Sequence, residues 1–141
     1  MEIEAGIDRY TLGISNWYVV GDGGKLTVVD AGTRGDWKLL QRALAQHGRT
    51  LHDVDVILLT HAHADHTGFA ERARAEGGVT VRVHEADAEA ARTGKVGARD
   101  GGLTKYLLRR ETYRTVFGLA RTGGVSIAPI KEVSSFRAGE V

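Results

Sequence analysis

Short apolar runs alternate with segments of helical period along most of this chain. β-Branched, aromatic and apolar residues at 14–20 and 25–30 flank the turn Gly21-Asp22-Gly23-Gly24, which predicts a hairpin. The continuous apolar run within 54–60 is too short for an ordinary helix and predicts a strand buried on both faces. A further strand is predicted at 80–83.

Helix signals fill the stretches between these strands. Asp36 is predicted to cap a first helix, and the next two helices are predicted at 69–76 and 85–92, each closed by glycine. A stripe of apolar and aromatic positions over 103–117 predicts a longer amphipathic helix, and 127–130 predicts a short strand. Because strands and helices alternate, the sequence indicates the α/β class.

Length and composition fit one globular domain over 1–141. The chain is 42% hydrophobic, and its 19 Lys and Arg residues balance 18 Asp and Glu residues, so charge gives no argument for a nucleic acid partner. No segment has the roughly 20 apolar residues of a membrane helix, and Met1–Tyr10 lacks signal-peptide features, so we expect a soluble, cytoplasmic protein without a membrane partner. Because cysteine is absent, a bound metal must use histidine and carboxylate ligands.

A cluster of potential metal ligands, His61-Ala62-His63-Ala64-Asp65-His66, follows the predicted strand at 54–60 directly. Open α/β sheets bind ligands at the carboxyl ends of their strands. In an extended stretch His61 and His63 point the same way and can meet one metal, while a turn presents Asp65 and His66 to a second. These nitrogen and oxygen donors suit Zn²⁺ best, with Fe or Mn as alternatives. The competing interpretation is a polar loop whose histidines only cap the strand.

The remaining candidates are single residues. His47 and His52 are expected to be structural or solvent-exposed. His84 ends a predicted strand, yet packing is favoured there over a ligand role. Asp30 ends another predicted strand, and two roles stay open for it: capping of the following turn, or a hydrogen bond to a metal-ligating histidine.

The segment Thr60-His61-Ala62-His63-Ala64-Asp65-His66-Thr67-Gly68 resembles the motif of the metallo-β-lactamase-fold hydrolases. The segments Asn16–Val20 and Val28–Gly32 before it, and His84-Glu85 after it, occur in the family's order. The resemblance covers approximately Tyr10 to Arg92. It implies the amino-terminal half of a metallo-β-lactamase-like αββα sandwich.

The resemblance also implies roles for individual residues. His61 and His63 would help to bind one zinc, and Asp65 and His66 the other, with two zinc ions in a complete domain. Asp65 would also take part in catalysis by handling a proton. Asp30 matches the family's strand-end aspartate near the site.

The later ligands of the family have no counterpart in this chain. The family uses a third histidine for the first metal, a bridging aspartate and a further histidine for the second, whereas here no histidine follows His84. Asp87 falls in a predicted helix and Asp100 in a predicted loop, neither of them a bridging context. We therefore expect a single, incomplete domain, truncated before these ligands, with one sheet face uncovered and open to self-association.

The function implied by the resemblance is hydrolysis of a small-molecule ester, thioester or lactam-like substrate by water activated at a dinuclear zinc site. The chain by itself is expected to be an inactive fragment. One alternative is a noncatalytic metal-binding or interaction module. Another is a phosphodiesterase or nuclease of the same fold, which is disfavoured because the basic cluster around Lys105, Arg109, Arg110 and Arg114 is small.

Overall fold

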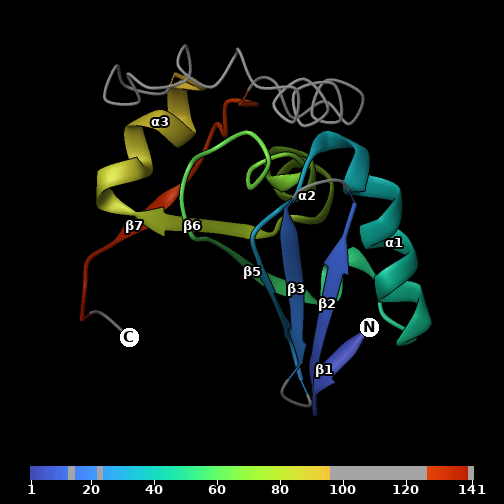
Figure 1. The fold of residues 1–141 in the computed structure, drawn as a ribbon. Helices are drawn as coiled ribbons and strands as arrows, with labels where there is room; N and C mark the ends of the chain where they lie inside the picture. The colour runs from blue at the N-terminus through green and yellow to red at the C-terminus, as the bar shows by residue number, and fades with distance from the viewer. Residues whose placement is uncertain (13–14, 22–23, 96–126, 140–141) are drawn as a thin grey trace, which may run out of the picture.

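The computed structural model describes residues 1–12, 15–21, 24–95 and 127–139. Within these residues seven strands form one sheet, accompanied by three α-helices (Figure 1). The strands are β1 (Glu2–Glu4), β2 (Ile7–Thr11), β3 (Asn16–Gly21), β4 (Leu26–Val29), β5 (Val54–Leu59), β6 (Thr80–His84) and β7 (Ser134–Phe136). The helices are α1 (Trp37–Gln46), α2 (Ala70–Gly77) and α3 (Ala88–Thr93), and 3-10 turns occupy Arg34–Asp36, Leu51–Asp53 and Glu85–Asp87.

The strands lie in the sheet in sequence order, from β1 at one edge to β7 at the other. β1 to β4 pair antiparallel, and β4 to β7 pair parallel. This change of direction follows from the connections, since a short turn suffices between antiparallel strands whereas parallel strands need a crossover such as α1 or α2. The predicted hairpin of β3 and β4 and the α/β class are confirmed.

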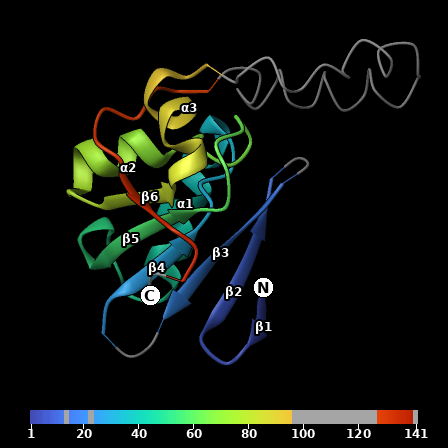
Figure 2. The same cartoon turned by 90° about the vertical axis from the view of Figure 1, so that its left-hand side faces the viewer.

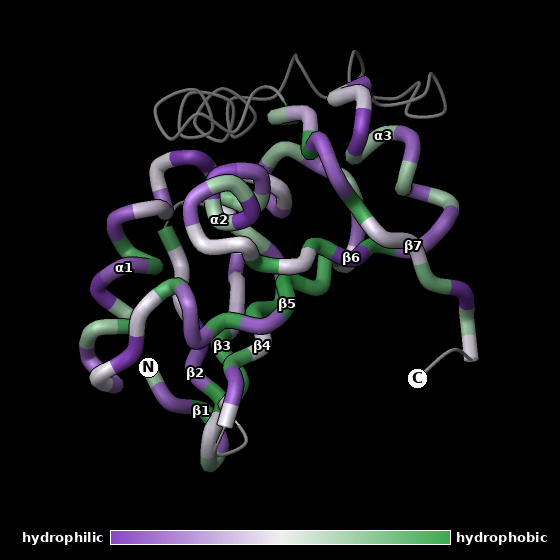
Figure 3. Tube along the Cα trace, turned by 180° about the vertical axis from the view of Figure 1, so that it is seen from behind, coloured by the Kyte–Doolittle hydropathy of each residue, from purple (hydrophilic) through white to green (hydrophobic). Residues whose placement is uncertain are grey.

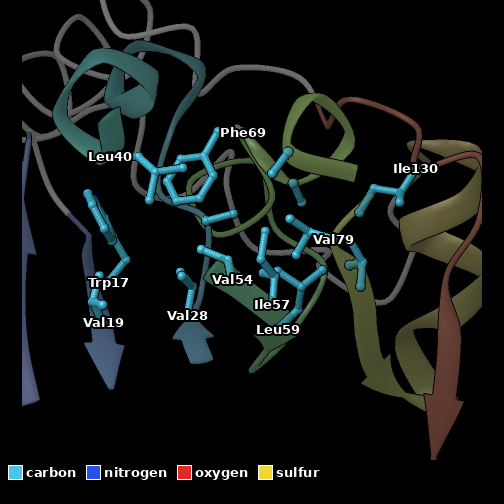
Figure 4. Close-up of a cluster of buried hydrophobic side chains, with 14 of the residues drawn as sticks. Trp17, Val19, Val28, Leu40, Val54, Ile57, Leu59, Phe69, Val79 and Ile130 are labelled. Carbon is cyan, nitrogen blue, oxygen red and sulfur yellow. The ribbon is translucent and has the colours of Figure 1, made fainter. Parts of the chain in front are cut away.

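The three helices pack on one face of the sheet (Figures 1 and 2). The register aligns one buried residue from each of four neighbouring strands, namely Val19, Val28, Ile57 and Val81. Leu40 of α1 and Ala73 of α2 belong to the same buried cluster, which lies between the helices and the strands (Figure 4). Burial of this apolar layer is the main stabilisation of the fold.

The opposite face of the sheet is only partly covered by the described residues. The next register row, Tyr18, Val29, Leu58 and Arg82, is half-buried. The prediction that β5 is buried on both faces is therefore wrong for this chain, because the described helices cover one face. Figure 3 shows the hydrophobic colour along much of β5.

Several local predictions need correction. Two strands, β1 and β2, were not predicted, because their residues are mostly polar and exposed and form no apolar run. The segment 127–130 forms no strand; Ile130 is instead fully buried, and its N–H donates to the carbonyl of Ala91 at the end of α3. The last strand is β7, and the helix predicted over 103–117 lies outside the described residues.

The side chain of Asp36 does not cap α1 as predicted. It is turned back, and it accepts hydrogen bonds from the backbone N–H and the hydroxyl of Thr33 at 2.8 and 2.6 Å. It also accepts one from the indole N–H of Trp17 at 2.9 Å. Asp36 therefore joins the start of α1 to β3.

No helix in the described parts of the chain has the length and hydropathy of a membrane span.

Candidate metal centre

The histidine-rich run leaves the carboxyl end of β5 and reaches α2 through an irregular loop. The loop that follows β4 runs beside it. Their backbones are joined by hydrogen bonds from Ala31 N to His66 O at 2.7 Å, from Gly68 N to Gly32 O at 2.8 Å and from Phe69 N to Ala31 O at 3.1 Å. Two parallel strands thus bring their carboxyl ends, and the loops that follow them, to one edge of the sheet.

The four predicted ligands lie close together in this loop. The ring centroids of His61 and His63 are 4.5 Å apart, and those of His61 and His66 are 4.1 Å apart. An oxygen of the Asp65 carboxylate lies 3.5 Å from Nε2 of His66. Ala62, 2% exposed, is buried in the core, so the loop is anchored between its first two histidines.

The ligands are gathered but not arranged around a metal. In the described part of the chain, no group of three or more histidine, aspartate or glutamate side chains stands in a geometry that holds a metal ion. Three imidazoles and one carboxylate are nevertheless the donors that zinc takes in proteins. The assignment of His61, His63, Asp65 and His66 as ligands therefore stays a prediction.

Asp30 is the central hydrogen-bond acceptor behind these residues. Its side chain is buried, and its backbone has φ 62°, a left-handed conformation that aspartate tolerates better than most residues. One carboxylate oxygen accepts the backbone N–H of Thr60 at 2.8 Å, and the other lies 2.8 Å from Nδ1 of His66. Of the two roles open to Asp30, the contacts match the one directed at a candidate ligand histidine.

The hydroxyl of Thr60 extends this network to His61. It lies 2.9 Å from both oxygens of Asp30 and 3.0 Å from Nδ1 of His61. Because the carboxylate can only accept, the single hydroxyl proton goes to Asp30, and Nδ1–H of His61 donates to the hydroxyl oxygen. Nδ1–H of His66 donates to Asp30 by the same logic. With Nδ1 of each histidine engaged in this way, Nε2 is the nitrogen left to bind a metal; in the metal-free chain Nε2 of His66 lies 3.5 Å from the carboxylate of Asp65.

The environment moves the pKa values of these two histidines in opposite directions. Burial lowers the pKa of His61, and the neighbouring charges of His66 and His63 lower it further. The hydrogen bond to Asp30 raises the pKa of His66, against an opposing effect of burial. His61 is therefore neutral at pH 7, which is the form that binds metals.

The other three histidines have different surroundings. Nε2 of exposed His47, just after α1, lies 2.8 Å from the carboxylate of Asp8, and His52 is exposed in a 3-10 turn. Nδ1 of His84 accepts the N–H of Ala86 at 3.2 Å and so caps the turn after β6. Among the described residues, the hydrogen bonds, ion pairs and ring contacts of these three histidines involve other partners than the histidine-rich run.

Sequence reasoning missed three residues beside the run. The hydroxyl of Ser15 donates to the carbonyl oxygen of Asp65 at 2.7 Å, Thr60 joins Asp30 to His61, and the carboxylate of Asp87 lies 3.5 Å from the backbone nitrogen of Ala62. Asp87 belongs to a 3-10 turn, not to the predicted helix. The sequence position of Asp87 just after β6 could have indicated this contact. β6 is the parallel neighbour of β5, and the carboxyl ends of adjacent parallel strands lie at the same edge of the sheet.

Comparison with known proteins identifies relatives of this arrangement. A model of the metallo-beta-lactamase superfamily matches residues 10–131. The metallo-beta-lactamase SMB-1, bound to 2-mercaptoethanesulfonate, is 20% identical with a TM-score of 0.70, and the match covers 96% of this chain and 45% of that one. A Cronobacter sakazakii metallo-beta-lactamase is 21% identical with a TM-score of 0.69, covering 99% of this chain and 46% of that one.

A third structure is BJP-1, a subclass B3 metallo-beta-lactamase of Bradyrhizobium japonicum. It is 26% identical with a TM-score of 0.56, and the match covers 63% of this chain and 34% of that one. Among curated proteins no match is found. The chain thus spans less than half the length of these three structures, and its likeness to them establishes the fold.

The family model covers most of the chain, including the histidine-rich run and both strands that position it. The sheet with helices on one face agrees with the fold of the solved relatives. The chain belongs to the metallo-beta-lactamase superfamily.

Proposed function

We propose that this chain carries the amino-terminal ligands of a dinuclear zinc hydrolase that cleaves a small ester, thioester or lactam-like substrate. The observation that carries the proposal is the gathering of His61, His63, Asp65 and His66 in one loop, with Nδ1 of His66 bonded to Asp30 and Nδ1 of His61 bonded to Thr60. A loop of merely structural histidines would not need a buried carboxylate and a threonine that engage Nδ1 of two histidines and leave Nε2 as the ligand nitrogen.

Each residue of the loop has a part in this proposal. His61 and His63 would hold one metal, and Asp65 and His66 the other, with Fe or Mn as alternatives to zinc. When bound, such metals supply the Lewis acidity that brings the pKa of a water molecule to about 7. Asp65, whose side chain is 21% exposed beside His66, would hold a proton during the reaction.

The substrate class is proposed from the names of the solved relatives. The solved relatives are named metallo-beta-lactamases, which favours a lactam-like or ester-like substrate over a phosphodiester. The described residues provide two candidate ligands for each metal, whereas zinc usually takes three or four protein ligands. The chain by itself is therefore expected to bind zinc weakly and to hydrolyse little.

A zinc titration of the 141-residue chain tests the ligand assignment. Isothermal titration calorimetry on the wild type and on the double variant His61→Ala/His63→Ala should show the loss of zinc binding in the variant. The double variant His47→Ala/His52→Ala removes the same number of imidazoles from exposed positions and should bind zinc as the wild type does. Unchanged binding in the first variant would refute the assignment.

Hydrolysis assays with a chromogenic β-lactam and a thioester separate the enzyme from the noncatalytic module. Zinc-dependent turnover by this chain, or by a longer chain that includes it, would support the hydrolase. Zinc binding without turnover in such a chain supports a metal-binding module.

A further inference from the structure

Ser15, which directly precedes β3, contacts the candidate metal loop. Ser15 is 6% exposed, and its hydroxyl donates to the backbone carbonyl of Asp65 at 2.7 Å, across 50 positions of sequence. This contact joins the antiparallel part of the sheet to a loop that belongs to its parallel part. The loop after β4 contacts the same run, so the run is held from two sides.

The carbonyl of Asp65 depends on this hydroxyl. The neighbouring carbonyls of the loop have backbone donors, since His63 O accepts from the N–H groups of His66 and Thr67, and His66 O accepts from Ala31 N. For the carbonyl of Asp65, the described part of the chain provides the Ser15 hydroxyl. Loss of the hydroxyl would leave a partly buried acceptor without its protein partner, which is destabilising.

This carbonyl belongs to the peptide that joins the two candidate ligands of the second metal. The plane of that peptide is defined by ψ of Asp65 and φ of His66. A rotation of the plane therefore changes the directions of both side chains relative to each other. One hydrogen bond at this carbonyl consequently restrains both ligands.

The position of Ser15 is set by Trp17, which lies two residues after it and is packed in the core. Trp17 is fully buried, stacks on Tyr10 with ring centroids 4.6 Å apart and donates its indole N–H to Asp36. Its ring also meets the edge of Phe69 at 5.3 Å, and Phe69 ends the loop that carries the histidines. The serine is thus two residues from a side chain locked in the core.

We infer that Ser15 is a positioning residue of the candidate metal centre, holding the peptide between Asp65 and His66 so that both side chains face the second metal. Ser15, which directly precedes β3, is thereby part of the support of the centre. The inference rests on the proposed function for its meaning in metal binding, whereas the anchoring of the loop is a property of the metal-free chain.

Hydrogen exchange in the metal-free chain tests the anchoring directly. The amides of His66 and Thr67, followed by NMR, should exchange roughly fivefold faster in Ser15→Ala, the factor that one net hydrogen bond is worth. Ser15→Thr, which keeps the hydroxyl, should restore the slow exchange. The control is Thr11→Ala, which removes the exposed bond from Thr11 to Asn16 near the same loop and should leave both amides unchanged. Equal exchange in Ser15→Ala and wild type would overturn the inference.

Zinc titration of the same variants then tests the positioning. Ser15→Ala should bind zinc several-fold more weakly than wild type, with recovery in Ser15→Thr. Faster exchange with unchanged zinc affinity would overturn the positioning role. Faster exchange in a chain whose wild type binds no zinc would support the anchoring and overturn the proposed function, so the two failures are distinguishable.

Discussion

Asp30→Asn is the substitution that separates metal binding from folding most clearly. Asparagine keeps the shape of the side chain and tolerates the left-handed backbone at φ 62°, so the variant introduces no new backbone strain. The amide oxygen can still accept the N–H of Thr60. Its NH₂ group, however, faces Nδ1 of His66, where the carboxylate had accepted a proton.

The magnitude follows from the lost bond and the changed tautomer. A hydrogen bond to a charged group contributes about 1.5–3 kcal/mol, so we expect Asp30→Asn to reduce the free energy of unfolding by about 2 kcal/mol. An NH₂ group opposite Nδ1 favours the His66 tautomer that carries its proton on Nε2, which is then unavailable to a metal. Loss of such a supporting partner weakens metal binding by roughly 10- to 100-fold.

A control comes from a carboxylate at the opposite end of β5. Asp53 directly precedes that strand and accepts hydrogen bonds from the backbone N–H and the hydroxyl of Thr50 at 2.7 and 2.9 Å and from Arg49 at 3.3 Å. Asp53→Asn should therefore lower the stability in urea denaturation while leaving the zinc affinity of the folded chain unchanged. Calorimetric zinc titrations of both variants, at a temperature where both are folded, provide the comparison.

Two results would refute this reasoning. Equal zinc affinity in Asp30→Asn and wild type would show that the carboxylate does not orient a ligand. Equal weakening in Asp30→Asn and Asp53→Asn would show that the loss reflects general destabilisation.

Three further predictions concern stability and association. Gly68→Ala should destabilise the fold by about 3 kcal/mol in urea denaturation, because the added Cβ would lie 2.1 Å from the backbone of Thr33. A cost smaller than about 1 kcal/mol would contradict the close approach of the two loops. The hydrogen bond from Arg74 lowers the pKa of Glu71, so the stabilising effect of this pair is present above the ordinary pKa of 4.5 and is lost as pH falls through the lowered pKa. The unfolding midpoint of wild type should therefore drop more than that of Glu71→Gln between pH 7 and pH 3. Parallel pH curves of the two proteins would contradict this. Self-association through the half-buried sheet face stays a prediction, and sedimentation should show concentration-dependent dimers of wild type that Leu58→Lys abolishes.

The sequence determined the local elements that carry a strong periodic signal. The apolar runs of β3 to β6 and the glycine stops at Gly78 and Gly94, both left-handed in the structure, were visible without any tertiary information. The position of the histidine-rich run at a strand end was equally visible, because it depends only on the boundary of β5. Local hydrophobic pattern and turn chemistry are short-range properties, and they are written in neighbouring residues.

The distant residues that support the run come together through strand pairing and loop packing, which act over long separations in sequence. Ser15 lies 50 positions from Asp65, Asp30 lies 36 positions from His66, and Asp87 approaches Ala62 from the end of another strand. Ser15 and Asp87 are single polar residues without a periodic signal, whereas Asp30 was a candidate from the sequence with two open roles, and its contact with His66 depends on the tertiary structure. Likewise, β2 forms because β3 offers it a pairing edge, and β1 pairs in turn with β2; neither strand forms because its own residues are apolar. The chemistry of the candidate centre was thus legible in one short motif, whereas its support depends on strand pairing, which brings separate loops to one edge of the sheet.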